Sequence, residues 1–317
     1  MNYLLELAEE HSVKVALLNE ANVYHLRAAN TDAIREGRPE PFVFSEEGTK
    51  GRDFWTDEDG IRKAYDRSRC SAAVMSPLGP SLLGEDDVRA TSASLTHPRR
   101  PDIPFANSRP GSWIAATVTI GTEKMTCISL YGLIEELTDA SMHRSLSDIS
   151  PIFSDPRHNG LVLLGGDFNT STATETSNRE RDRIVLDRIK AYGLVDCLAK
   201  WRDDNRIPPL AGCRCDDEPC RHTLTRLIPN REGEHIPWQD RVPYQVDYLF
   251  ASEALADRLY GVVETSPDEW SGTAITAQSS RRSGRDRSSG ALCPGAEQCR
   301  ALCDDFRSWR LRPGERV

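Results

Sequence analysis

Short apolar runs alternate with polar, turn-rich segments as far as about residue 270. Residues 3–10 (YLLELAEE) place apolar side chains at helical spacing, and the run at 13–18 (VKVALL) predicts a strand that stops at Asn19 and Glu20. Residues 30–66 are polar and rich in turn formers, so we expect a loop there, with one short hairpin. The chain therefore opens with a helix, a strand and an acidic residue at the end of that strand.

Further along the chain, β-branched and apolar runs predict a series of strands. The runs are SAAVMS (71–76), WIAATVTIG (113–121), MTCISLYG (125–132), LVLL (161–164) and YQVDYLFAS (244–252). The polar joint GTEK between the second and the third run predicts an antiparallel hairpin. One helix is expected around SMHRSLSDISPIF, and another over 178–192 with Gly193 as its C-terminal cap.

The order of these elements predicts the fold class. Hairpins are mixed with strand–helix pairs, without the regular alternation of a Rossmann domain. No GxGxxG follows a strand and no GxxxxGKS/T occurs, which argues against dinucleotide-binding and P-loop proteins. We therefore expect an α+β protein in which helices cover layered sheets.

Polar side chains stand at or near the ends of four apolar runs. These residues are Glu20 in VALLNEA, Tyr131 in ISLYG, Asp167 and Asn169 in LVLLGGDFN, and Asp247 in YQVDYLF. In an extended chain Asp167 and Asn169 would point to the same face about 7 Å apart, close enough to share one ligand. The repetition of this feature predicts one polar site at the strand ends.

Asp247 is the hardest of these residues to explain as a structural residue. Its neighbours in the strand are apolar, and an unpaired buried carboxylate costs several kcal/mol, so we expect a metal or another cation beside it. Structural roles remain open for the others: an Asx turn or helix cap for Asp167, Asn169 and Thr170, a first helical turn for Glu20, and a core aromatic for Tyr131.

Composition and charge narrow the classes of protein further. The chain has 317 residues, 38% of them hydrophobic and 28% charged, which suits a globular protein. No apolar stretch approaches the roughly 20 residues of a membrane helix, and the first 30 residues carry acids where a signal peptide has a basic flank. We expect a cytoplasmic protein without a membrane span, in which the nine cysteines are reduced.

The charge is distributed unevenly along the chain. The net charge is −9, and residues 273–317 hold nine arginines and five acids, so this segment is +4 and the rest is −13. An acidic domain lacks a broad electrostatic footprint for nucleic acid. The best local basic candidate is 97–109 (HPRRPDIPFANSR), either a phosphate-contacting loop or an ordinary solvated turn.

Four segments, LLNEA, SLYG, GGDFN and YQVDYLFAS, resemble in their order the successive motifs of the endonuclease/exonuclease/phosphatase superfamily, which has the DNase I-like fold. GDFN is the most specific of them. The resemblance implies a four-layer α/β/β/α sandwich over residues 1–272 and Mg²⁺- or Mn²⁺-dependent hydrolysis of phosphate esters. Residues 273–317 would form an Arg/Ser/Gly-rich disordered tail.

The resemblance also implies roles for individual residues. Glu20 would bind the metal, and Asp247 would assist the metal or orient a catalytic histidine. Asp167 would align or deprotonate the attacking water. Asn169 would hold a phosphate oxygen and Tyr131 would support the phosphate. Carboxylate oxygens suit a hard cation, and an amide can donate to an anionic phosphate without adding repulsion.

Two parts of the family pattern are missing. Family members open with a strand carrying an Asn near the metal, whereas this chain starts at the following helix, and they end with Ser-Asp-His, whereas no Asp-His pair occurs here. We therefore expect a fold that lacks its first and last strands. The first of these is central in its sheet, so its loss leaves an open edge unless another segment replaces it, which the sequence leaves open. Loss of the histidine should nearly abolish turnover.

The segment Thr273–Ser279 suggests how the last motif was lost. Written as ACA GCG ATC ACA GCC CAA TCG, it gives Ser-Asp-His-Ser-Pro-Ile when translated from the third base. A frameshift in a GC-rich message is therefore our hypothesis for 273–317, and codons incompatible with Ser-Asp-His in the shifted frame would disprove it.

A second group of residues could bind metal. Cys213, Cys215, Cys220 and His222 lie within ten residues and supply three thiols and an imidazole, the ligand types of a structural Zn²⁺ site. The spacing is not a common zinc pattern, so a loop with ordinary reduced thiols is the alternative.

Two classes of function remain. The first is a nuclease-like, metal-dependent hydrolase of phosphodiester or phosphomonoester bonds, impaired by loss of Ser-Asp-His. Its substrate would be nucleic acid, a lipid head group or a small phosphate ester. The second is a catalytically inactive DNase I-like binding protein or a decayed member of the family.

Overall fold

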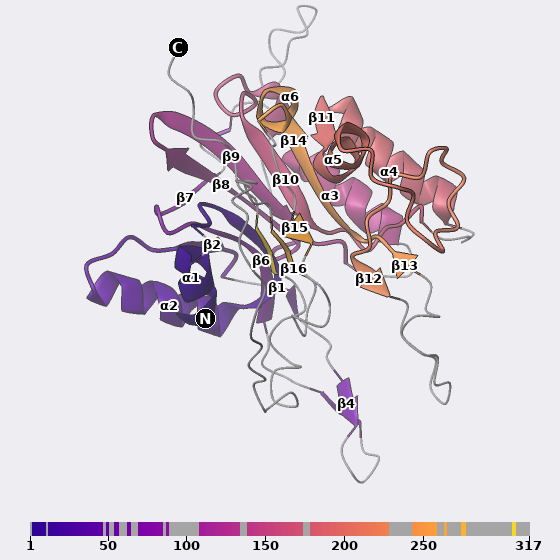
Figure 1. The fold of residues 1–317 in the computed structure, drawn as a ribbon. Helices are drawn as coiled ribbons and strands as arrows, with labels where there is room; N and C mark the ends of the chain where they lie inside the picture. Colours follow the sequence, from indigo (N-terminus) through magenta and orange to yellow (C-terminus); the bar gives the residue numbers. More distant parts are fainter. Residues whose placement is uncertain are drawn as a thin grey trace, which may run out of the picture.

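We analysed a computed structural model of the chain (Figure 1). It describes fourteen segments of the chain. They are residues 2–10, 12–46, 49–50, 54–56, 62–64, 69–84, 87–88, 108–133, 138–173, 178–227, 243–258, 263–264, 274–276 and 306–308.

The first sheet is built around two long strands, β1 (Ala16–Asn22) and β6 (Arg69–Met75), which pair antiparallel. The strand order is β15-β16-β17-β1-β6-β2, and β3 also pairs with β6. The shorter strands are β2 (Phe42–Phe44), β3 (Thr49–Lys50), β15 (Val263–Glu264), β16 (Ala274–Thr276) and β17 (Phe306–Ser308). In this sheet β1 is central, because β6 pairs with one of its edges and β17 with the other.

The second sheet has the order β11-β14-β10-β9-β8-β7. β9 and β10 are parallel, and β14 is antiparallel to β10. The strands are β7 (Ser81–Leu82), β8 (Trp113–Ile120), β9 (Glu123–Leu130), β10 (Val162–Asp167), β11 (Leu194–Asp196) and β14 (Asp247–Ser252). β10 is buried along its whole length, so both of its faces are covered.

Helices lie outside both sheets, as Figure 1 shows. Those beside the first sheet are α1 (Asn2–Glu10) and α2 (Val23–Arg35), and those on the second are α3 (Thr138–Ser154) and α4 (Arg179–Ala191). Two shorter helices, α5 (Cys197–Asp204) and α6 (Glu253–Ala256), flank β11 and β14. Two small hairpins complete the described fold, β4 (Phe54–Thr56) with β5 (Arg62–Ala64) and β12 (Arg226–Leu227) with β13 (Pro243–Tyr244).

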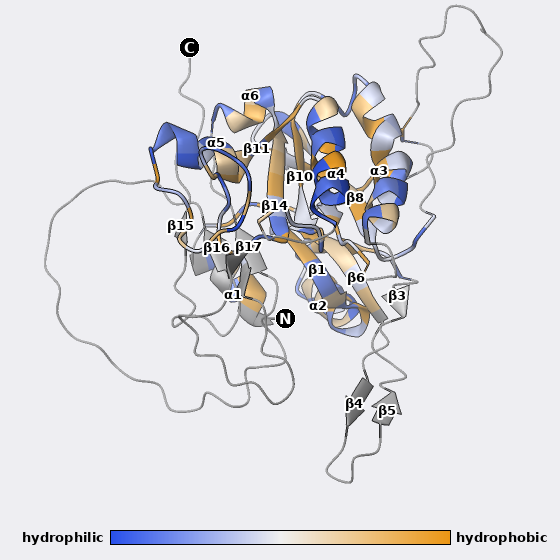
Figure 2. Ribbon diagram, turned by 90° about the vertical axis from the view of Figure 1, so that its right-hand side faces the viewer, coloured by the Kyte–Doolittle hydropathy of each residue, from blue (hydrophilic) through white to orange (hydrophobic). Residues whose placement is uncertain are grey.

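Three apolar clusters fill the spaces between these layers. Leu17 and Val74 belong to the cluster between the two sheets, whereas Leu18 and Met75 pack toward α1 and α2. A third cluster packs the second sheet against α3 and α4, and Figure 2 shows β10 and β14 as largely hydrophobic. The alternation of side chains along β1 and β6 thus serves two cores at once. The expected α+β class is confirmed, and the clusters separate four layers.

Most of the predicted elements are present. The helix at 3–10, the strand at 71–76 and the hairpin of β8 with β9 are confirmed. The helix predicted over 178–192 is α4, and Gly193 follows it with a φ of +81° while its N–H donates to the Lys190 carbonyl. Gly193 thus ends the helix in the left-handed conformation that favours glycine.

Two expectations were wrong, and one question that the sequence left open, whether another segment replaces the first strand, has an answer. The strand predicted at 13–18 runs from Ala16 to Asn22, so Glu20 lies inside it rather than after it. The loop predicted over 30–66 begins inside α2, whose buried stripe is narrow and whose other positions are mostly polar. The expected hairpin occurs as β4 with β5. No open edge is found at β1 in the described residues, because β17 pairs with Ala16–Leu18.

Within 273–317 only β16 and β17 are described, both as strands of the first sheet. The rest of the predicted disordered tail lies outside the described residues, as does most of the basic segment 97–109. Among the described helices, none has both the length and the apolar character needed to cross a bilayer.

Candidate active site and a cysteine–histidine cluster

Two carboxylates face each other where β10 ends and β14 begins. Asp167 and Asp247 are cross-strand partners in the antiparallel pair, and both are buried, at 8% and 3% exposure. Leu163 in β10 and Leu249 in β14 lie on the same faces of their strands as the two carboxylates, and both belong to the cluster between the sheets. Both carboxylates therefore project toward the first sheet. This site lies at the lower end of the sandwich in Figure 1, where β14 starts beside β13.

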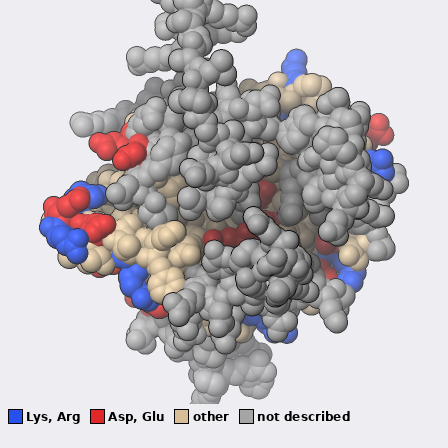
Figure 3. Space-filling view, turned by 90° about the horizontal axis from the view of Figure 1, so that it is seen from below, with Lys and Arg blue, Asp and Glu red and all other residues tan. Residues whose placement is uncertain are grey.

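Cross-strand partners on one face have Cβ atoms about 4.5–5.5 Å apart, and like charges placed there repel. Two buried carboxylates at this separation provide the oxygen ligands that Mg²⁺ and Mn²⁺ prefer. The donor set therefore fits a hard divalent cation. Seen from below in Figure 3, acidic side chains are visible in a recess near the middle of the face.

The glycines before Asp167 are required by close packing. A Cβ on Gly165 would lie 2.8 Å from both the Leu249 side chain and the Tyr248 carbonyl, and one on Gly166 would lie 2.1 Å from the Leu130 carbonyl. Gly166 also has a φ of +143°, which disfavours any residue with a side chain. The Gly-Gly pair thus allows β9 and β14 to pack closely against β10 just before Asp167, at the end of the sheet.

The chain turns immediately after Asp167, and Asn169 has a φ of +48°. The Asn169 N–H donates to Asp167 Oδ1 at 2.9 Å, and Asn169 Nδ2 donates to the Gly132 carbonyl at 2.7 Å. Gly132 N–H in turn donates to the Asp167 carbonyl at 2.7 Å. The expectation that Asp167 and Asn169 extend side by side was wrong, because the strand ends in an Asx turn. The two residues are nevertheless held together.

Glu20 reaches the same region from the first sheet. The pairing of β1 with β6 shifts register between Leu18 and Ala21, and Glu20 has a φ of +50°. Tyr131, next to Gly132, donates from its hydroxyl to Glu20 Oε1 at 2.5 Å. Strict alternation would turn Glu20 away from the second sheet, so the irregularity is what directs it there. Left-handed backbone outside glycine costs free energy and is concentrated at functional sites.

Asn19 belongs to this region but was not predicted as a site residue. It is buried at 7% exposure, and Ser129 Oγ lies 3.1 Å from its amide. With the amide oriented so that Nδ2 donates to Ser129, Oδ1 accepts from the Asp167 N–H. Asn19 therefore joins β1 to β10 directly. Its place beside Glu20 in LLNEA was the available signal.

The predicted site residues thus form one group of contacts. Asp167 pairs with Asp247 across the sheet and bonds to Asn169, while Tyr131 connects Glu20 to the turn at Gly132. The alternative of an Asx turn at Asp167 also holds, and Glu20 is not in a first helical turn. Asp167 therefore has a structural role in the Asx turn and is also one of the acidic groups that converge in this region.

The cysteine–histidine cluster, defined as Cys213, Cys215, Cys220 and His222, lies on the helix side of the second sheet. Its four ligand atoms all lie within 4.8 Å of one another. His222 Nδ1 is 3.6 Å from Sγ of Cys213 and 3.6 Å from Sγ of Cys220. His222 Nε2 is 2.8 Å from Thr172 Oγ1.

Burial changes the titration of this cluster. It raises the pKa of the Cys215 thiol to about 12 and lowers the pKa of His222, which favours the neutral imidazole. Burial also acts to raise the pKa of Cys220. There the backbone hydrogen bonds from His222 and Leu210 and those from the other thiols outweigh it, so its pKa is lowered.

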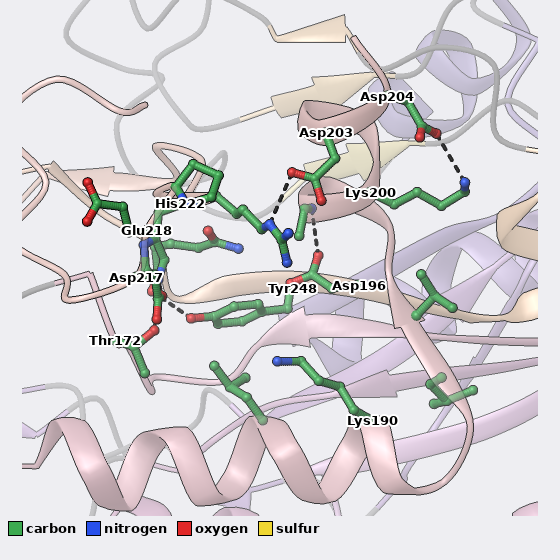
Figure 4. A pocket seen from close by; sticks show the side chains of 17 residues that line it. Thr172, Lys190, Asp196, Lys200, Asp203, Asp204, Asp217, Glu218, His222 and Tyr248 are labelled. Carbon is green, nitrogen blue, oxygen red and sulfur yellow. Dashed lines mark hydrogen bonds and ion pairs between the residues drawn. The ribbon is translucent and has the colours of Figure 1, made fainter. Parts of the chain in front are cut away.

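A cavity of about 690 Å³ lies beside this cluster, between α4, α5 and the segment 217–222 (Figure 4). Its lining charges are of both signs and partly paired, with Lys200 3.1 Å from Asp204 and Arg221 3.0 Å from Asp203. The residues that line the cavity do not include Asp167 or Asp247, so the cavity is separate from the carboxylates at the end of β10.

No family model and no curated protein matches the chain. Solved structures similar to it include an AP endonuclease from Archaeoglobus fulgidus, with 15% identity, a TM-score of 0.44 and coverage of 83% of this chain and 86% of that one. A 3′ phosphatase from Neisseria bound to product DNA hairpin has 14% identity, a TM-score of 0.46 and coverage of 82% and 84%.

An endonuclease/exonuclease/phosphatase family protein from Leptotrichia buccalis has 12% identity, a TM-score of 0.38 and coverage of 80% of both chains. The three proteins are thus an endonuclease, a phosphatase and a member of the endonuclease/exonuclease/phosphatase family.

Proposed function

We propose that the chain is a nuclease-like, divalent-metal-dependent hydrolase of phosphodiester or phosphomonoester bonds, with a turnover that is impaired by the absence of the Ser-Asp-His motif. The observation that carries this proposal is the cross-strand pair of buried carboxylates, Asp167 and Asp247, facing the first sheet where Glu20 and Asn19 enter. Two buried carboxylates can lie side by side in their charged form when a cation binds at the same site. Phosphate hydrolysis benefits from such a cation, because negative charge develops on the phosphate oxygens.

Mg²⁺ or Mn²⁺ is the cation that this donor set would hold, through Asp247 and Glu20. When bound, it supplies charge stabilisation for the oxygens of the transferred phosphoryl group. The Tyr131 hydroxyl holds the Glu20 carboxylate by the 2.5 Å hydrogen bond, which limits the rotamers open to a long and flexible side chain.

Asp167 is placed to orient the attacking water and to accept its proton. Its Oδ1 accepts from the Asn169 N–H, which fixes the carboxylate plane and lowers the entropy cost of orienting a water against it. Proton transfer to a carboxylate held in this way contributes typically 10²–10⁴-fold in rate.

Asn169 is proposed to bind a phosphate oxygen. One hydrogen of its amide nitrogen is used on the Gly132 carbonyl, and the second remains for an anionic oxygen. A neutral donor stabilises developing negative charge without competing with the carboxylates for the cation.

The proposal is tested by hydrolysis assays with and without Mg²⁺ or Mn²⁺. The substrates are abasic duplex DNA, unmodified DNA, a generic aryl phosphodiester and an aryl phosphomonoester. Metal-dependent turnover of at least one of them, lost on chelation and restored by Mg²⁺, is expected. A folded protein that turns over none of them contradicts the proposal.

A second function, binding without turnover, is favoured by one observation. The sequence has no Asp-His pair, and three of the described histidines are engaged elsewhere: His143 with Arg188, His158 with Asp87, and His222 with Thr172. Saturable binding of an oligonucleotide by a folded chain that hydrolyses no substrate would support this second function instead.

A further inference from the structure

The cysteine–histidine cluster has the dimensions of a metal tetrahedron. With Zn–S near 2.3 Å and Zn–N near 2.0–2.1 Å, tetrahedral angles place sulfur and nitrogen ligands about 3.6 Å apart. Both measured sulfur-to-Nδ1 distances are 3.6 Å, and all four ligand atoms lie within 4.8 Å of one another. Three thiols and one imidazole are the Cys₃His set of structural zinc sites.

The groups around the cluster orient its histidine as a metal ligand. Thr172 Oγ1 lies 2.8 Å from His222 Nε2, and the two residues border the same cavity (Figure 4). With its proton on Nε2 the ring donates to Thr172, which leaves the Nδ1 lone pair directed at the thiols. A partner of this kind on the second ring nitrogen is a regular feature of metal-binding histidines.

The polypeptide around the cluster is ordered without secondary structure of its own. Residues 205–225 connect α5 to β12 without a helix or strand of their own. Connections of this length are uncommon in compact domains unless something holds them together. A metal that joins residues 213, 215, 220 and 222 would close this connection on itself, and its binding free energy would offset the conformational entropy lost when the connection is ordered.

The connection also supports both strands that carry the paired carboxylates. On one side, Ala173 O accepts from Arg214 N at 3.0 Å and lies 3.3 Å from Cys213 Sγ, which fixes the segment that follows Asn169. On the other side, Thr225 Oγ1 accepts from the N–H groups of Val246 and Asp247 at 3.0 and 3.2 Å.

We propose that the cysteine–histidine cluster binds one structural Zn²⁺, which braces the segment after β10 and the start of β14. Zinc binding itself is independent of any catalysis. The bracing of the active site rests on the proposed function, because it matters for turnover only if the carboxylates act in catalysis.

The test measures zinc in the purified full chain by mass spectrometry after dialysis, for the wild type and three variants. We expect one zinc per chain in the wild type and in Cys70→Ser, which lies on β6 outside the cluster, and strong loss of zinc in Cys215→Ser and Cys220→Ser. Wild-type protein with well under half a zinc per chain, or equal zinc in all four proteins, overturns the proposal.

Two measurements on the wild type keep the test valid if the cluster variants fail to fold. Replacement of the ion by Co²⁺ should give the intense visible absorption of a tetrahedral thiolate site. Chelation should expose three additional thiols to a thiol reagent under native conditions. Absence of the cobalt spectrum, or thiols that are fully reactive or joined in a disulfide before chelation, contradicts zinc binding. None of these readouts depends on hydrolysis, so the two proposals can fail separately.

Discussion

Asp167 and Asp247 are paired directly across two neighbouring antiparallel strands, with both carboxylates buried on the face that looks toward the opposite sheet. β10 brings the first to its C-terminal end and β14 begins with the second. Two like charges at facing positions repel each other, so the pair is unfavourable on its own. A cation bound beside the carboxylates offsets this repulsion.

Asp167→Asn is expected to reduce metal-dependent hydrolysis by about 100-fold or more, because the amide cannot accept the proton of the attacking water. The matched control is Asp187→Asn, on the exposed face of α4, where the carboxylate pairs only with Lys190 in the described residues. Initial rates at saturating substrate measure both. Equal activity of Asp167→Asn and the control would exclude Asp167 from the chemistry.

Gly132→Ala is expected to destabilise the fold by about 3 kcal/mol or more, because the new Cβ would lie 2.0 Å from the Phe168 carbonyl. The control is Gly160→Ala, where nothing lies within 4 Å of the added atom. Urea denaturation gives the free energy of unfolding of both variants. A Gly132→Ala protein as stable as the control would show that the turn after β10 is not packed against Gly132 as described.

The long strands could be predicted from the sequence because their burial is decided locally. β6, β8 and β9 are apolar on both faces and bounded by polar joints, so the pattern alone locates them. α2 was missed because few of its positions are buried and the helix is held by its Asn22 cap and by packing on β1 and β6. Tertiary contacts, which the local pattern does not contain, decide its conformation.

The same distinction applies to the site. Asp167 and Asp247 stand out locally as acids within buried strands. Asn19 does not, because its partners Ser129 and Asp167 lie more than a hundred residues away and only the packing of the two sheets joins them. The left-handed backbone at Glu20 and Asn169 was equally hidden, since neither residue type requires it.

Asp182 should make stability depend on pH. Burial raises its pKa from 3.8 to about 6, although the Ser171 N–H that donates to Oδ2 at 2.9 Å acts in the opposite direction. Between these two values the folded protein holds a proton that the unfolded chain has released, so stability falls as pH rises from about 4 to 6. After allowance for solvent screening the loss is about 1–2 kcal/mol.

Asp182→Asn removes this titration while keeping an acceptor for Ser171. Its stability relative to the wild type should therefore increase by the same amount between pH 4 and pH 6, as measured by denaturation at a series of pH values. Stability curves that stay parallel over this range would show that Asp182 titrates near its ordinary value in the folded protein.

Thr172→Val tests the orientation of the zinc ligand His222. The valine has a similar shape but cannot accept from Nε2, so zinc affinity in a competition with a chromogenic chelator should fall about 10–100-fold. The tetrahedral cobalt spectrum should persist, because all four ligands remain. The control is Thr31→Val, at an exposed position of α2, which should leave the zinc affinity unchanged. Equal zinc affinities for both variants would show that Thr172 does not orient His222.

The central claim, that Asp247 and Glu20 hold a hard divalent cation beside Asp167, is tested most directly by Mn²⁺ binding, measured from the electron paramagnetic resonance signal of the free ion. The protein is the full chain with its cysteine–histidine cluster loaded with zinc. We predict saturable binding in the wild type and in Asp187→Asn that is lost in the Asp167→Asn, Asp247→Asn double variant, with folding confirmed by circular dichroism. Equal Mn²⁺ binding in all three proteins, or no saturable binding in the wild type, would contradict the claim.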